Sequence, residues 1–185
     1  MERGGTELFA NLSFMAQPGA HVALTGRNGA GKTSLLRALA GFLKPSAGAI
    51  RFDCGEDAPR HTHFLGHRDG LKGALDVREH VIFWRDLLGG AGDADAALKR
   101  VGLSHICDLP ARALSAGQGR RLSIARLLVA PRAVWLLDEP AAALDTAGKA
   151  LLAGIIDEHR AGGGVVIAAV HEPLGAPDSE VRIGA

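Results

Sequence analysis

Residues 26–33 read Gly26-Arg27-Asn28-Gly29-Ala30-Gly31-Lys32-Thr33. This stretch follows the apolar run at 20–24 and precedes residues 34–40, whose composition is typical of a helix. A strand, a glycine-rich loop and a helix in this order predict a phosphate-binding loop. Glycines let successive backbone N–H groups surround an anion, and the positive end of the helix dipole points at the same place. The alternative is an ordinary glycine-rich turn, which the flanking strand and helix disfavour.

The pattern also predicts what the individual residues of the loop do. All eight residues from 26 to 33 are expected to bind a nucleoside triphosphate. The ammonium group of Lys32 would reach the β- and γ-phosphates, and the hydroxyl group of Thr33 would hold Mg²⁺.

Composition and charge exclude several other classes of protein. The formal net charge is +1 and aromatic residues make up 4% of the chain, so neither a basic field nor stacking platforms favour a nucleic-acid partner. Cys54 and Cys107 lack the C-x-x-C spacing and are expected to be reduced thiols. The longest apolar runs are far shorter than the roughly 20 residues that a membrane span requires.

The order of patterns along the chain predicts an α/β protein with a parallel core sheet. We expect strands at 8–15, 20–24, 49–52, 62–66, 133–137 and 165–170. Between them, Asp76 and Glu79 have the spacing of a capping box, and a second helix is expected at 93–101. Residues 1–185 are therefore expected to form one domain. Within it, a helical subdomain at about 70–113 is inserted between core strands and is followed by a helix at 114–130.

A second small polar motif opens that last helix. It reads Leu114-Ser115-Ala116-Gly117-Gln118. Because Ser115 and the N–H group of Gly117 lie at a helix N-terminus, the motif is a candidate second anion cradle. The simpler alternative is an ordinary helix cap by Ser115.

The apolar strand at 133–137 ends in two carboxylates, Asp138 and Glu139. Parallel sheets bind ligands at the carboxyl ends of their strands, so this position favours chemistry. Asp138 is the expected Mg²⁺ partner, and Glu139 is placed to polarise an attacking water molecule. The alternative is a pair of solvated acidic side chains.

Taken together, these motifs resemble those of the ATP-binding cassette (ABC) ATPases, and the resemblance covers essentially the whole chain. The family order continues with Asp145 in the loop at 143–145 and with His171 after the strand at 165–170. The resemblance implies a P-loop NTPase fold of the ABC type with a short antiparallel β region. It also implies that His171 contacts the γ-phosphate and that Lys32 and Glu139 are catalytic.

The resemblance further implies a head-to-tail homodimer. Each ATP would lie between the loop at 26–33 of one subunit and the residues Ser115, Ala116, Gly117 and Gln118 of the other. Asp145 would lie at the seam between the subunits. A second cradle makes physical sense in such a dimer, since it closes over the γ-phosphate face that one cradle leaves open.

A narrower resemblance concerns the ATP-binding subunits of cytochrome c maturation systems, which export haem. It rests on the stretches at 64–67, 70–72, 114–118 and 135–140, and on His171-x-Pro173-Leu174. It implies a peripheral subunit at the cytoplasmic face of a bacterial inner membrane, bound to integral membrane subunits of the transporter. Another small ABC transporter is the alternative. A haem or zinc site at His61, His63 and His67 with Cys54 is disfavoured, because the spacing matches no usual ligand pattern.

One residue departs from the family pattern. Where these ATPases carry a glutamine after the strand near His67, this chain has Arg68, which cannot accept a hydrogen bond and repels Mg²⁺. A nucleotide-gated subunit without hydrolysis is therefore a further alternative, although Lys32, Asp138, Glu139 and His171 argue against it.

Overall fold

A computed structural model describes residues 1–3, 6–53, 61–170 and 174–184 of the chain. Two compact units make up the fold. Unit 1 contains residues 1–66, 132–140 and 156–185, and unit 2 contains residues 67–131 and 141–155.

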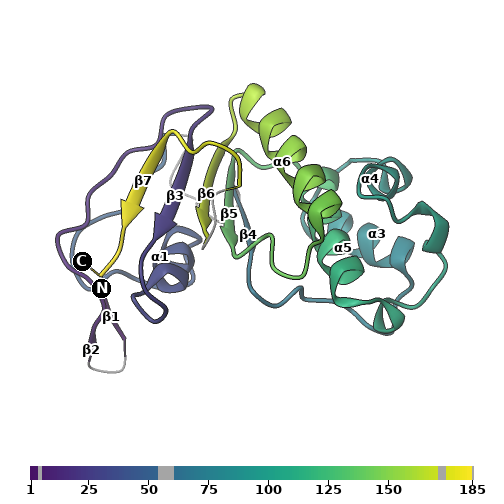
Figure 1. The fold of residues 1–185 in the computed structure, drawn as a ribbon, viewed down its shortest axis with the longest axis horizontal. Coiled ribbons are helices and arrows are strands. Elements are labelled where there is room, and N and C mark those ends of the chain that lie inside the picture. Colours follow the sequence, from purple (N-terminus) through teal and green to yellow (C-terminus); the bar gives the residue numbers. More distant parts are fainter. Residues whose placement is uncertain (4–5, 54–60, 171–173, 185) are drawn as a thin grey trace. The chain divides into compact units, whose positions relative to one another are not determined.

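Unit 1 is built on a parallel five-stranded sheet with the order β4-β5-β6-β3-β7 (Figure 1). Its strands are β3 (His21–Thr25), β4 (Thr62–Leu65), β5 (Val134–Asp138), β6 (Val165–Ala169) and β7 (Ser179–Arg182). The helix α1 (Lys32–Leu39) follows β3 after the glycine-rich loop. Because β5 is fully buried along its length and pairs on both sides, its carboxyl end is a rigid place for side chains. The predicted parallel α/β architecture is confirmed.

The core of unit 1 lies between α1 and the central strands. Leu24, Leu36 and Leu136 are completely buried in one cluster, which brings the helix after the glycine-rich loop against β3 and β5. Burying a leucine side chain contributes about 1.5–3 kcal/mol, so this cluster holds the loop and the end of β5 in fixed positions.

Two predicted strands are absent from the described structure. Residues 8–15 and 49–52 form no strand, and the prediction for them was wrong. Asn11 has a positive φ of 52°, which interrupts an extended conformation. Phe14 and Phe52 still pack against the core, so burial rather than strand pairing explains the apolar pattern. The described antiparallel strand pair consists of β1 (Glu2–Arg3) and β2 (Thr6–Glu7).

Unit 2 is helical. It contains α3 (Val77–Leu87), α4 (Ala94–Arg100), the short 3₁₀ helices η1 (Ser104–Ile106) and η2 (Ala111–Ala113), α5 (Ala116–Val129) and the first part of α6 (Thr146–Ala161). The predicted capping box is confirmed: the N–H of Glu79 donates to Asp76 at 2.7 Å, and the N–H of Asp76 donates to Glu79 at 3.1 Å. In the described part of the chain, no helix combines the length and the apolar character that crossing a bilayer takes.

His80 makes the stability of unit 2 dependent on pH. It is 1% exposed, and its Nε2 accepts a hydrogen bond from Trp84 Nε1 at 3.3 Å, so the neutral ring is the one that fits. Burial, assisted by the nearby charges of Arg126 and Lys72, lowers the pKa of His80 to about 4. In the unfolded chain the His80 ring takes up a proton near pH 6.5, whereas in the folded chain it stays neutral until the pH approaches 4. The contribution of neutral His80 to the free energy of unfolding is therefore fully present above pH 6.5 and is lost as the pH falls toward 4.

We expect the free energy of unfolding to fall by about 2–3 kcal/mol across this window because of His80. Urea denaturation at a series of pH values measures the change. His80→Gln should make that dependence shallower, with the remainder coming from His21 and His159, whose pKa values burial also lowers, whereas His105→Gln, at an exposed position, should leave it intact. An identical pH profile in wild type and His80→Gln would contradict the assignment to His80.

Candidate nucleotide-binding site

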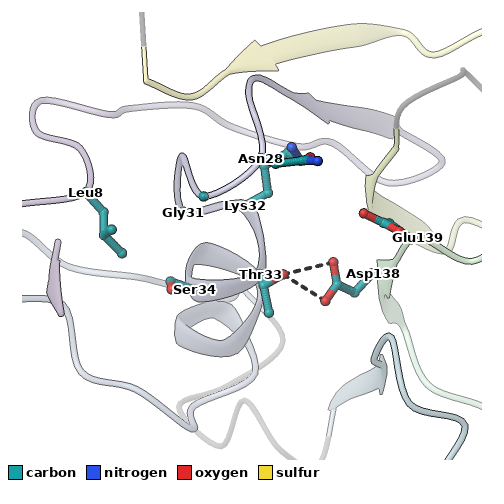
Figure 2. A pocket seen from close by; sticks show the side chains of 9 residues that line it. Leu8, Asn28, Gly31, Lys32, Thr33, Ser34, Asp138 and Glu139 are labelled. Carbon is teal, nitrogen blue, oxygen red and sulfur yellow. Dashed lines mark hydrogen bonds between the residues drawn. The ribbon is translucent and has the colours of Figure 1, made fainter. Parts of the chain in front are cut away.

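A pocket of about 310 Å³ lies at the start of α1 and the carboxyl end of β5 (Figure 2). Its lining residues all belong to unit 1 and are Leu8, Asn28, Gly29, Gly31, Lys32, Thr33, Ser34, Asp138 and Glu139. The predicted phosphate loop and the predicted acidic strand end, about a hundred residues apart in the sequence, thus meet in one pocket.

The loop at 26–33 has a backbone that requires glycine. Gly26, Gly29 and Gly31 have φ angles of 133°, 82° and 109°, in the region that other residues rarely adopt. At Gly26 an added Cβ would lie 2.3 Å from the carbonyl oxygen of Ile183, and at Gly31 it would lie 3.0 Å from the ring of Phe9. The loop is therefore both curled and closely packed, as an anion cradle requires.

Lys32 closes the loop on itself. Its Nζ donates to the carbonyl oxygens of Gly26 at 2.7 Å and of Arg27 at 3.2 Å, and the residue is only 8% exposed. These bonds hold the ammonium group inside the ring of backbone that would surround the phosphates, so its charge is already positioned.

Thr33 and Asp138 join α1 to β5. The Thr33 hydroxyl group lies 2.9 Å from Asp138 Oδ2 and 3.1 Å from Oδ1, as the dashed lines in Figure 2 show. Asp138 is 5% exposed. A hydroxyl oxygen and a carboxylate are the hard oxygen ligands that Mg²⁺ prefers, so the donor set of this pair fits the ion.

Glu139 follows in a different conformation. Its φ angle is 48°, a rare value for this residue type, and its N–H donates to the carbonyl oxygen of Ala169 at 2.9 Å. Its carboxylate points toward the glycine-rich loop (Figure 2). Such local strain is found mostly at functional sites, and here it turns Glu139 toward the pocket.

The second candidate cradle lies in unit 2 and is a well-formed helix cap. Ser115 Oγ accepts from the N–H of Gln118 at 3.3 Å, and Gln118 Oε1 accepts from the N–H of Ser115 at 2.9 Å. The simpler alternative, a helix cap by Ser115, is therefore present in the isolated subunit. The S-x-x-Q spacing was a signal for this capping box in the sequence. A role for Ser115, Ala116, Gly117 and Gln118 toward ATP stays a prediction.

Asp145 caps α6. Its Oδ1 accepts from the N–H of Gly148 at 2.7 Å and from Arg121 Nη2 at 2.8 Å. Both hydrogen bonds stabilise the charged carboxylate and lower the pKa of Asp145, and the bond from Gly148 has the larger effect. Asp145 is therefore ionised at neutral pH.

An ion pair that sequence reasoning missed joins α5 to the segment after β4. The Arg120 side chain is 2% exposed, and its Nη1 lies 2.9 Å from Asp69 Oδ1. The hydroxyl group of Ser123 donates to the backbone carbonyl oxygen of Asp69 at 2.9 Å. At Gly119 an added Cβ would lie 3.0 Å from Leu71 Cδ1, so the Leu71 side chain would have to shift slightly to accept a longer residue there. The neighbouring Arg68 is exposed.

Two predictions fall on residues that the structure does not describe: His171 and Cys54 lie outside the described ranges. Among the residues that are described, no three His, Cys, Asp or Glu side chains gather in a group that could hold a metal ion.

Comparison with known proteins places the chain in a family. Residues 9–142 match the ABC transporter family. The cytochrome c biogenesis ATP-binding export protein CcmA of Rhodopseudomonas palustris (strain HaA2) is 57% identical over 187 residues, which cover 99% of this chain and 94% of that protein. The protein of the same name from Nitrobacter winogradskyi is 56% identical, with 98% and 93% covered.

Solved structures agree on the fold. The ATP-binding subunit of an ABC transporter superposes with a TM-score of 0.86 at 21% identity, covering 98% of this chain and 81% of that one. A putative ABC transporter ATP-binding protein from Pyrococcus furiosus gives 0.84 at 22% identity, with 96% and 91% covered. With the glycine-rich loop, the hydrogen-bonded Thr33–Asp138 pair and the family match in agreement, the chain belongs to the ABC transporter family and is an ATP-binding subunit of such a transporter.

Proposed function

We propose that this chain hydrolyses ATP to power the haem export step of cytochrome c maturation. The observation that carries the proposal is the 57% identity, over nearly the full chain, to a protein named for ATP-binding export in cytochrome c biogenesis. The pocket formed by Lys32, Thr33, Asp138 and Glu139 supports the chemistry, because these side chains cover phosphate binding, metal binding and activation of water.

In this proposal the backbone N–H groups of the loop at 26–33 and the Lys32 ammonium group bind the phosphates. Thr33 and Asp138 would hold Mg²⁺, which when bound neutralises developing charge on the phosphate oxygens. Glu139 orients a water molecule toward the γ-phosphate and accepts its proton. His171 assists at the γ-phosphate.

The complete site is proposed to form between two copies of the chain, each acting as one ATPase domain over residues 1–185. The helix N-terminus at 115–118 of one copy binds the triphosphate held by the loop of the other, and Asp145 lies at the seam. The N-terminus of a helix carries the positive end of the helix dipole and attracts anions, which supports this role for α5.

We propose that the partners are integral membrane subunits, which bind the chain at the cytoplasmic face of a bacterial inner membrane, and that no nucleic acid takes part. Affinity purification of the tagged chain from detergent-solubilised membranes, with ATPase activity measured on the same sample, tests this. The expected result is co-purification of integral membrane proteins together with ATP hydrolysis. Deletion of the gene is a second experiment, and it should abolish covalent attachment of haem to c-type cytochromes.

Normal c-type cytochromes in the deletion strain would contradict the transport process. ATP hydrolysis in the same sample would then still support the ATPase assignment, so the two parts of the proposal are tested separately.

A further inference from the structure

The loop at 141–145 and the helix α5, both in unit 2, are tied by one ion pair. Arg121 on α5 places Nη2 2.8 Å from Asp145 Oδ1. The same oxygen accepts the N–H of Gly148 in the first turn of α6 at 2.7 Å. A single carboxylate oxygen thus connects the start of α6 to α5, and nothing in the sequence motifs assigns a role to Arg121.

The loop also touches the first turn of α5 directly. An added Cβ at Gly117 would lie 3.0 Å from the carbonyl oxygen of Ala143, closer than most real contacts of that kind. Ala143 itself has a φ angle of 62°, which is rare for alanine and costs energy unless the surroundings hold it in place. The loop therefore keeps its shape and its distance to Gly117 through the contacts around it.

The Arg121–Asp145 pair is suited to hold the distance between the loop at 141–145 and Gly117 rather than to stabilise the fold. Its side chains are 22% and 69% exposed, and exposed ion pairs contribute little to stability. The geometry is nevertheless specific, because the carboxylate is already oriented by its bond to Gly148. Loss of the guanidinium group would release one side of the loop while leaving the cap of α6 in place.

We propose that Arg121 is a positioning residue that sets the spacing between the loop at 141–145 and the first turn of α5, so that Ala116 and Gly117 present their N–H groups correctly to a bound triphosphate. This inference rests on the proposed function, in which that helix turn binds ATP held by a second copy of the chain. Arg121 acts through Asp145 and Gly117 and does not itself touch ATP.

The test uses the complete chain carrying Glu139→Gln, which is expected to form a stable ATP-bound dimer. The ATP concentration for half-maximal dimer formation is measured by light scattering, with and without Arg121→Ala. Since displacement of a positioning group by about 1 Å can cost up to a hundredfold, we expect Arg121→Ala to raise that concentration roughly tenfold. Arg121→Lys, which keeps a cation near Asp145, should recover part of the loss.

Two further measurements separate positioning from general weakening of the fold. The Tm of Arg121→Ala and the affinity of its monomer for ATP should match those of the parent, because the loop at 26–33 belongs to unit 1. Arg78→Ala is the matched control, since it breaks another exposed Arg–Asp pair in unit 2, with Asp95 at 2.9 Å. It should not change dimer formation. If Arg121→Ala does not fold, Arg121→Gln replaces it.

Dimer formation by Arg121→Ala at the same ATP concentration as the parent would overturn the inference. An equal loss in Arg78→Ala would overturn it too, because the effect would then be one of general stability. A parent that binds ATP and stays monomeric at every concentration would contradict the proposed dimer itself, and the inference would fall with it.

Discussion

Replacing Glu139 by glutamine is expected to lower kcat for ATP hydrolysis by about 10²–10⁴-fold, the usual contribution of a positioned general base. The amide keeps the size and direction of the side chain and cannot accept a proton from water. The backbone bond from Glu139 to Ala169 is unaffected by the change, so the strained conformation at the end of β5 should persist. ATP binding should remain, and the variant should accumulate as an ATP-bound dimer.

Phosphate release measures the rate, and light scattering with ATP measures the dimer. Glu158→Gln, an exposed position on α6, is the matched control and should behave as wild type. If Glu139→Gln hydrolyses ATP at the wild-type rate, the assignment of Glu139 as the base is wrong. If the variant neither hydrolyses nor binds ATP, the substitution has disturbed the pocket, and the affinity measurement shows this directly.

Replacing Lys32 by alanine is expected to weaken ATP binding by about 10–100-fold, because hydrogen bonds to charged groups contribute about 1.5–3 kcal/mol each. Two effects add. The cation that faces the phosphates is removed, and the carbonyl oxygens of Gly26 and Arg27 lose the donor that holds the loop closed. Isothermal titration with ATP and Mg²⁺ measures the affinity.

Lys44→Ala, an exposed lysine beyond the end of α1 in unit 1, tests whether overall charge is responsible. It should bind ATP as wild type does. Undiminished binding by Lys32→Ala would contradict the proposed contact with the phosphates.

Much of unit 1 was predictable because its signals are local. Short, mostly apolar runs mark β3, β5 and β6, and the strands predicted near β3, β4, β5 and β6 are confirmed. The edge strand β7 (Ser179–Arg182) carried no such signal. Among the strands that the structure describes it pairs only with β3, and it is largely exposed, so its sequence is polar. At residues 8–15 the predicted strand was wrong for the opposite reason: Phe9, Leu12 and Phe14 are apolar and pack partly buried against the core, but the segment pairs with no strand in the described structure.

The sequence by itself determined the phosphate loop, the acidic end of β5 and the helix caps of α3 and α5, since glycine spacing, apolar runs and capping residues act over a few neighbouring positions. The tertiary structure decided which distant groups meet. The pairs Thr33–Asp138, Arg120–Asp69 and Arg121–Asp145 join segments of the chain that no local pattern connects. The physical reason is that such pairs depend on how elements pack, and packing depends on the shape and volume of whole elements rather than on sequence spacing.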